Sequence, residues 1–200
     1  MMENINRAGV EALAADRIGE AAELAALCMA DNSYYADLYR GLPRRERLAQ
    51  MRERIKNTLV YCAANDGLFG VTGGRGLAAY EYLVDYRKLK EETPALCRAI
   101  FSYGDAAGDA PHLREIERRL AELLAAGRRI TYILGCGVAP WARNSLFALA
   151  AMAHFNKRLL LSEEVIAADF SNRALLSLCA RHGTFEITAL GRDYWFFLRK

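Results

Sequence analysis

The spacing of apolar residues predicts that the chain opens with two helices. Over residues 16–30, apolar side chains recur at the three- and four-residue steps of one helical face. A second helix is expected after Pro43, because proline suits the first turn of a helix. Its buried side would carry Leu48, Met51 and Ile55.

The pattern then changes from helical spacing to strands. Residues 57–71 are expected to form a strand, an Asn-Asp-Gly turn and a second strand, and residues 77–84 a third strand. A glycine-rich stretch over 70–76 lies between the second and third of these strands. It lacks the Gly-Lys-Ser/Thr ending of a phosphate-binding loop, so the glycines are interpreted as strand corners.

The second half of the chain alternates helices and strands. Two helices are expected over 86–103 and 110–127, and the second is amphipathic and ends at Gly127. The elements expected next are a strand over 128–138, a helix after Arg143, a strand over 159–169, a short helix over 171–183 and a hairpin around Gly191. This order predicts one α/β or α+β layered domain over residues 1–200, with a mixed sheet.

Composition places the chain among ordinary globular proteins. Its 200 residues are 53% hydrophobic and 26% charged, which suits one domain with a sizeable core. No apolar run is long enough to span a membrane, and the N-terminus lacks the pattern of a secretory signal. A cytoplasmic protein is therefore expected.

Cysteines and histidines give no pattern of a disulfide frame or a metal site. The five cysteines are scattered and contain no Cys-x-x-Cys pair, so they are expected to be reduced thiols, mostly in the core. The three histidines lie far apart in sequence, and no metal site is expected.

The charge gives little reason to expect a nucleic-acid partner. The formal net charge is +3, and one stretch, over 40–56, is locally basic, with seven basic residues against two glutamates. This stretch is either the solvated face of an amphipathic helix or a surface for an anionic partner. No aromatic residues are interleaved with the basic ones, so nucleic-acid binding is not expected.

The segment LGCGVAPWARNSLFALA, residues 134–150, raises the main question about function. An apolar strand runs into a short turn with one arginine and then into an alanine-rich helix. Such a unit either packs in the core or holds the phosphates of a cofactor on the free N–H groups of the helix N-terminus.

This segment and two others resemble the GNAT-type N-acetyltransferases. Residues 134–150 are similar to the central strand, the Val-x-Pro step and the cofactor turn of that family. The segment NRALLSLCARHGTF and the hairpin at the C-terminus resemble the segments that follow. The resemblance implies a mixed, mostly antiparallel twisted sheet with helices on both faces. It also implies a helical insertion over 85–127, before the central strand, which would act as a lid or mediate dimers.

The resemblance also implies a binding site for acetyl-CoA. The residues that it assigns to the cofactor are Cys136, Gly137, Val138, Arg143, Asn144, Ser145, Leu146, Phe147, Ala148 and Asn172. Among them, the N–H of Val138 would polarise the carbonyl of the thioester. Two positions depart from the family: Asn144 stands for a glycine and tolerates positive φ, whereas Leu146 stands for a glycine and would crowd a diphosphate.

The catalytic groups are less clearly marked. Cys179 takes the place of the family tyrosine that protonates the departing thiolate, and is either that acid or a small core thiol. Tyr132 or Tyr194 are alternative acids. No general base is evident, and Glu81, Glu163 and Glu164 are either bases, amine anchors or surface carboxylates.

The expected function is the transfer of an acetyl group from acetyl-CoA to the primary amine of a small molecule or a peptide. The alternative is a catalytically degenerate protein of the same fold that binds an acyl-CoA or a protein partner. Leu146 and Cys179 motivate this alternative. A homodimer is compatible with both.

Overall fold

The computed structural model describes residues 9–101, 111–161, 164–171, 176, 180, 185–191 and 194–199. The chain divides into two compact units. Unit 1 comprises Met1–Asp31, Gly41–Leu83 and Leu134–Ser162, and unit 2 comprises Asn32–Arg40, Val84–Ile133 and Glu163–Lys200. That the whole chain behaves as one domain stays a prediction.

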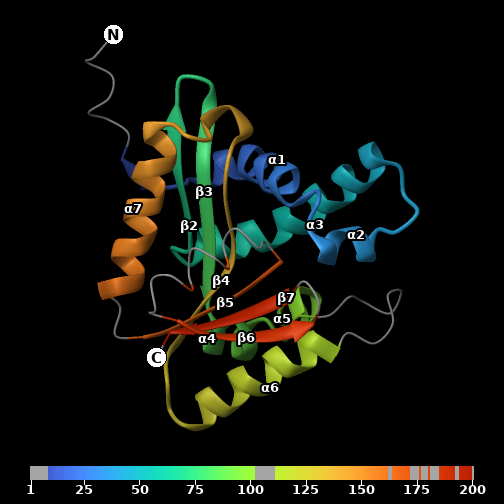
Figure 1. Ribbon diagram of the computed structural model, residues 1–200, viewed down its shortest axis with the longest axis vertical. Helices are drawn as coiled ribbons and strands as arrows, with labels where there is room; N and C mark the ends of the chain where they lie inside the picture. Colours follow the sequence, from blue (N-terminus) through green and yellow to red (C-terminus); the bar gives the residue numbers. More distant parts are fainter. Residues whose placement is uncertain are drawn as a thin grey trace. The chain divides into compact units, whose positions relative to one another are not determined.

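Unit 1 places helices on both faces of an antiparallel sheet (Figure 1). Its elements are β1 (Val10–Ala12), η2 (Ala15–Arg17), α1 (Ile18–Met29), α3 (Arg44–Ala64), β2 (Leu68–Gly73), most of β3 (Gly76–Asp85), the end of β4 (Ile130–Val138), η3 (Pro140–Ala142) and α7 (Leu146–Leu161). Helix α1 packs on α3, whereas α7 packs on β1 and β2. Side chains of alternate residues on β2 and β3 therefore meet different helices.

The α7 side of unit 1 holds a small apolar core. Val71 on β2, Ala79 on β3 and Ala151 on α7 are fully buried, and Val138 and Phe147 pack against them. Val71 and Ala79 are also direct partners in the antiparallel ladder. This packing fixes the start of α7 over the sheet.

Unit 2 combines helices with the other part of the sheet. Its elements are α2 (Ser33–Leu38), α4 (Tyr86–Glu92), α5 (Pro94–Phe101), α6 (Pro111–Ala125), the start of β4, β5 (Val165–Phe170), β6 (Glu186–Gly191) and β7 (Tyr194–Arg199). Strands β4 and β5 are parallel, and β7 pairs antiparallel with β5 and β6. Hydrogen bonds link the strands of the whole sheet in the order β1-β2-β3-β4-β5-β7-β6. The mixed, mostly antiparallel sheet with helices on both faces is confirmed.

The structure corrects the prediction of a strand at residue 57. The residues up to Ala64 extend α3, because Leu59 and Cys62 continue the buried stripe begun by Met51 and Ile55. The Asn-Asp-Gly segment ends this helix instead of turning a hairpin, since the N–H of Gly67 donates to the carbonyl of Cys62 at 2.7 Å. The strand that pairs with β2 on its other side is β1.

Two other boundaries differ from the sequence expectation. The helix expected over 86–103 is divided into α4 and α5, because Pro94 disfavours helical backbone at Thr93. Residues 159–161 belong to α7, and β5 begins only at Val165. The helices, strands and hairpin expected elsewhere are confirmed within a few residues, except the short helix over 171–183, which lies mostly outside the described residues.

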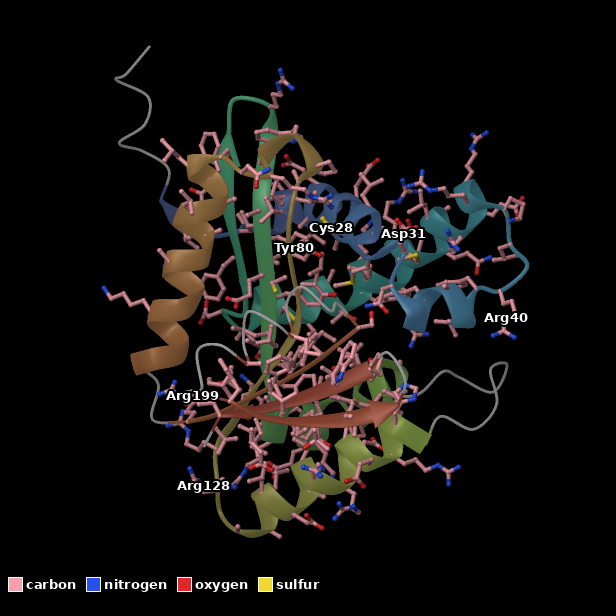
Figure 2. The ribbon with its side chains drawn as sticks, in the orientation of Figure 1. Cys28, Asp31, Arg40, Tyr80, Arg128 and Arg199 are labelled. Atoms are coloured by element: carbon pink, nitrogen blue, oxygen red, sulfur yellow. The ribbon has the colours of Figure 1, made fainter. Side chains whose placement is uncertain are left out.

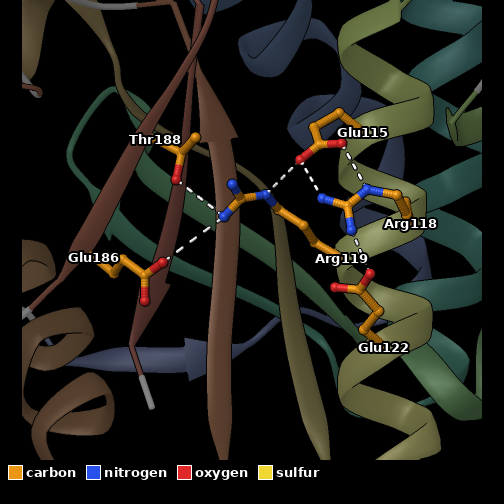
Figure 3. Close-up of polar contacts among 6 residues, drawn as sticks. All are labelled: Glu115, Arg118, Arg119, Glu122, Glu186 and Thr188. Carbon is orange, nitrogen blue, oxygen red and sulfur yellow. Dashed lines mark hydrogen bonds and ion pairs between the residues drawn. The ribbon is translucent and has the colours of Figure 1, made fainter.

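Helix α6 is tied to the edge strand β6 by Arg119 (Figure 3). The Arg119 guanidinium donates to Glu115 on its own helix at 2.8 Å and to the hydroxyl of Thr188 on β6 at 3.1 Å. It also lies 3.8 Å from the carboxylate of Glu186. Arg118, one residue earlier, pairs with Glu115 and with Glu122, both on α6.

Replacing Arg119 is therefore expected to loosen β6, whereas replacing Arg118 is not. Arg119→Met removes a half-buried donor to β6, which should lower the free energy of unfolding by about 1 kcal/mol. Arg118→Met removes two surface ion pairs within one helix and should change the free energy of unfolding by less than about 0.5 kcal/mol. Urea unfolding measures both, and equal losses for the two variants would contradict the assignment.

The pKa of Glu115 predicts that the ion pairs of α6 survive moderate acid. Hydrogen bonds from Arg118 and Arg119 lower the pKa of this carboxyl from 4.5 to about 2. Because the folded pKa lies below the unfolded one, the pairing stabilises the folded chain above pH 4.5 and is lost as the pH falls through about 2. A carbon-13 NMR titration of Glu115 should show the low midpoint, and a midpoint near 4.5 would contradict it.

Candidate functional site

Strand β4 extends beyond its pairing with β5. The parallel ladder ends with Ile133 opposite Ala168, whereas β4 runs on to Val138. On the other edge, the N–H of Ala139 donates to the carbonyl of Ala78 on β3 at 2.8 Å. Successive N–H groups of a strand point to opposite edges, so the N–H of Val138 faces away from β3.

The turn between β4 and α7 has a left-handed residue at the position expected. Asn144 has φ of 63°, and Arg143 before it is extended. Asparagine adopts this region more readily than most residues, so Asn144 supplies the backbone conformation for which glycine is usually chosen. Both residues are exposed.

The N-terminus of α7 presents two main-chain donors. The Ser145 hydroxyl oxygen accepts from the N–H of Ala148 at 3.4 Å, which makes Ser145 the N-cap. The first N–H groups of a helix have no acceptor within the helix. Within the described part of the chain, the N–H groups of Leu146 and Phe147 have no hydrogen-bond partner. These groups lie at the positive end of the helix dipole.

Some side chains of the turn pack against the sheet, and others are exposed to solvent. The rings of Trp141 and Phe147 meet edge to face at 6.3 Å and lie over Gly73, where an added Cβ would be 2.9 Å from Trp141. The side chain of Leu146 is 54% exposed, so it takes no part in this packing. Leu149, one turn later, is also exposed.

The glycines of β4 accommodate tyrosine rings. A Cβ added at Gly135 would lie 2.6 Å from the ring of Tyr82, and one at Gly137 would lie 2.8 Å from the ring of Tyr80. That Gly137 contacts the cofactor stays a prediction. In the structure, the lack of a side chain at Gly137 leaves room for the ring of Tyr80. Cys136 between the two glycines is exposed.

Cys28 on α1 contacts the same end of β4 (Figure 2). Its thiol donates to the carbonyl of Val138 at 3.5 Å. Burial raises the pKa of the Cys28 thiol, while the positive charge of Arg143 and a hydrogen bond with Tyr80 lower it. This thiol, expected only as core, therefore helps to hold the residue whose N–H the family motif assigns to the thioester.

Tyr132 lies in a buried aromatic cluster of unit 2. Its side chain is 1% exposed, and its ring contacts Phe101 edge to face at 5.0 Å. Its hydroxyl donates to Asp169 on β5, and the hydroxyl of Tyr194 on β7 donates to the other oxygen of the same carboxylate. The structure thus brings together the two tyrosines that the sequence offered as alternative acids. A catalytic role for Tyr132 stays a prediction.

Asp169 is the residue of this cluster that sequence reasoning missed. It stands in the strand VIAADF, where it is the sole charged residue among apolar neighbours. A charged residue within an otherwise apolar strand is the signal that could have found it, because buried carboxylates need hydrogen-bond partners.

Of the three glutamates offered as bases, the two within the described residues have different surroundings. Glu164 accepts from Thr131 and pairs with Arg129 at 2.6 Å, beside the first residues of β4. Glu81 on β3 is 2% exposed, so the interpretation as a surface carboxylate is wrong for this residue. It stands opposite Phe69 in the ladder, and Phe69 contacts His154 on α7.

Several expectations lie outside the described residues. Asn172, Cys179 and Glu163 are among them. In the described ranges, four cysteines are free thiols and no group of histidine, cysteine and carboxylate side chains is arranged to hold a metal. No helix in the described part of the chain is long and apolar enough to cross a membrane.

The fold is that of the GNAT-type acetyltransferases, as structural comparison shows. No protein-family model matches the chain, and a search of curated proteins finds no significant match. Among solved structures, an apo agmatine N-acetyltransferase aligns with a TM-score of 0.62 at 10% identity, over 94% of this chain and 97% of that chain.

Two further structures show the same fold with a bound molecule. The C-terminal condensation domain of Ebony, in complex with beta-alanyl-dopamine, aligns with a TM-score of 0.62 at 10% identity, over 95% of this chain and 97% of that chain. A GNAT-superfamily phosphinothricin acetyltransferase from Sinorhizobium meliloti, in complex with AcCoA, aligns with a TM-score of 0.52 at 13% identity, over 95% and 86%. At identities of 10–13%, the similarity to these structures shows a shared fold and nothing further.

Proposed function

We propose that this chain is an N-acyltransferase that moves an acetyl group from acetyl-CoA to the primary amine of a small molecule or a peptide. The observation that carries the proposal is the turn before α7. There the left-handed Asn144 leads into a helix whose N–H groups at Leu146 and Phe147 have no partner in the described part of the chain.

The residues of the turn fit a diphosphate. Two main-chain N–H donors at a helix N-terminus are the groups that bind phosphate oxygens. The exposed guanidinium of Arg143 adds a positive charge beside them. The exposed side chains of Trp141 and Leu149 offer apolar contacts to the rest of a large ligand.

The end of β4 would hold the reacting carbonyl. Acetyl-CoA supplies an activated thioester when bound. The N–H of Val138, on the edge away from β3, would donate to the carbonyl oxygen and stabilise the negative charge that develops there. Asn172 would contact the cofactor and Cys179 would protonate the leaving group, both by the family motif. A cytoplasmic location and a homodimer stay predictions.

The acceptor is proposed to be a small amine. One structural neighbour is an agmatine N-acetyltransferase, and another carries an acylated dopamine. Agmatine, dopamine and a short peptide with a free N-terminus are therefore the first amines to test. Incubation with acetyl-CoA should release thiol only when an amine is present, and mass spectrometry should detect the acetylated amine.

The second candidate is a protein of this fold that binds acyl-CoA without transferring the acyl group. The branched side chain of Leu146, where the family motif has glycine, favours it. Binding of acetyl-CoA with no transfer to any of the three amines would support this candidate. Leu146→Gly would then raise the affinity sharply if the native turn is a degraded site.

A further inference from the structure

The glycine-rich stretch over residues 70–76, which the cofactor turn does not account for, forms the tip of the β2–β3 hairpin. Gly73 pairs with Gly76, so Gly74 and Arg75 are the two residues of the turn. Arg75 is exposed, and within the described part of the chain no hydrogen bond or ion pair engages its guanidinium. Its positive charge is therefore available to a ligand.

The tip of this hairpin touches the turn that precedes α7. A Cβ added at Gly73 would lie 2.9 Å from the ring of Trp141 and 3.2 Å from the ring of Phe147, so the hairpin backbone lies directly against both rings. The two turns are at the same end of unit 1 (Figure 1). Because consecutive Cα atoms are about 3.8 Å apart, the Cα of Arg75 lies within about 8 Å of that of Gly73. The side chain of Arg75 therefore begins close to a residue whose N–H is proposed to bind the diphosphate.

Contacts with η2 and α1 hold the hairpin in this position. The N–H of Leu77 donates to the carboxylate of Glu20 at 2.5 Å, and the guanidinium of Arg17 donates to the hydroxyl of Thr72 at 3.3 Å. Arg17 and Glu20 also pair with each other at 2.7 Å, so their charges largely cancel. The hairpin tip is thus fixed on the side of α1 as well as against the cofactor turn, and Arg75 extends from a rigid element.

The cofactor of the proposed function carries two separate phosphate groups. One is the diphosphate, which is proposed to bind the start of α7 beside Arg143. The other is a phosphomonoester on the 3′ carbon of the ribose, with a charge of about −1.5 to −2 at neutral pH. Arginine binds such a group with two parallel charge-assisted hydrogen bonds. Because a phosphate dianion is costly to remove from water, an exposed guanidinium suits it better than a closed apolar pocket.

We propose that Arg75 binds the 3′-phosphate of the cofactor and makes the chain select acetyl-CoA over acetyl-dephospho-CoA. The inference rests on the proposed function and concerns residues of unit 1 alone. The lack of a side chain at Gly73 brings the hairpin against the cofactor turn, and nothing lies within 4 Å of a Cβ added at Gly74, beside Arg75. The stretch would bind phosphate through one side-chain cation, whereas a loop of the Gly-Lys-Ser/Thr type also uses a row of main-chain N–H groups.

Isothermal titration of the full chain with two ligands tests this assignment. Acetyl-CoA and acetyl-dephospho-CoA differ by the phosphomonoester alone, so the ratio of their dissociation constants isolates its contribution. The wild-type chain should bind acetyl-CoA about 5- to 10-fold more tightly, as a charge-assisted hydrogen bond at an exposed site allows. Arg75→Gln should bring the ratio to about one by weakening acetyl-CoA alone. Arg75→Lys keeps the charge without the planar fork and should retain part of the ratio.

Two other exposed arginines of unit 1 are the controls. Arg143→Gln should weaken both ligands by the same factor, because both carry the diphosphate beside this residue. Arg45→Gln removes a charge from the first turn of α3 and should leave the ratio of the two dissociation constants unchanged. A ratio that falls as far in Arg45→Gln as in Arg75→Gln would show that net charge alone decides it, and would refute the assignment.

Phosphorus-31 NMR reports on the phosphate itself. The signal of the 3′-phosphate is separate from those of the diphosphate and follows the second ionisation of the phosphomonoester, near pH 6 in free ligand. A neighbouring guanidinium favours the dianion, so this midpoint should be lower in the saturated wild-type complex than in free acetyl-CoA. In the complex with Arg75→Gln it should return to the value of the free ligand. A midpoint that is the same in both complexes would contradict a contact with Arg75.

Failure of this inference can be told apart from failure of the proposed function. Equal affinity of the wild-type chain for the two ligands, or an Arg75→Gln variant that weakens both equally, would refute the role of Arg75 and leave the cofactor site at the start of α7 in place. A chain that binds neither ligand at millimolar concentration would overturn both.

Discussion

Replacing Gly137 by alanine is expected to lower the free energy of unfolding by about 1–3 kcal/mol, because the new methyl group has no room. Its Cβ would lie 2.8 Å from a ring carbon of Tyr80 and 3.1 Å from the Cβ of Cys28. Tyr80 is fully buried, so its ring cannot move aside into solvent. The end of β4 would shift away from α1 in the variant.

Gly74→Ala is the matched control for this substitution. Gly74 lies in the turn between β2 and β3, and nothing lies within 4 Å of a Cβ added there. This variant should change the free energy of unfolding by less than about 0.5 kcal/mol. Urea unfolding of both variants measures the difference, and equal stabilities would show that the tyrosine side of β4 is loosely packed.

Replacing Leu146 by proline is expected to weaken acetyl-CoA binding by about 10- to 100-fold while the fold is kept. Proline at the first position of a helix is well tolerated, since its fixed φ suits the helix. The substitution removes one of the two N–H donors at the start of α7. A hydrogen bond to a charged group contributes about 1.5–3 kcal/mol, which corresponds to this loss of affinity.

Leu146→Ala separates the lost N–H from the lost side chain. Alanine shortens the exposed leucine and keeps the main-chain donor, so affinity should be unchanged or higher. Isothermal titration with acetyl-CoA measures both variants, and circular dichroism confirms that α7 is retained. Equal affinity of the proline and alanine variants would place the diphosphate elsewhere.

Local sequence patterns were sufficient to predict most of the helices and strands. The resemblance of residues 134–150 to a strand, a turn and a cofactor helix correctly indicated β4, Asn144 in a left-handed conformation and the start of α7. Such features depend on residues close in sequence. The apolar face of α6 was predicted for the same reason.

The error at residues 57–64 has a physical cause. Thr58 and Val60 are β-branched and favour strands locally. The buried stripe of α3 overrides this preference, since Leu59 and Cys62 face the same side as Ile55. Tertiary burial therefore decided the structure of a segment that propensity alone assigned to a strand.

The cluster around Asp169 could not be found from local patterns. Asp169 is separated by 37 residues from Tyr132 and by 25 residues from Tyr194. Strand register brings them together, and register depends on the whole sheet. The burial of Glu81 was missed as well, because the sequence of β3 alone does not show that both faces of this strand are covered from Leu77 to Tyr82.

The most direct measurement is a nitrogen-15 NMR titration of the labelled chain with acetyl-CoA. The amide signals of Leu146, Phe147 and Val138 should shift together and saturate, because the diphosphate and the thioester carbonyl accept from these N–H groups. Saturable shifts confined to other residues, or no shift at millimolar acetyl-CoA, would contradict a cofactor site at the end of β4 and the start of α7.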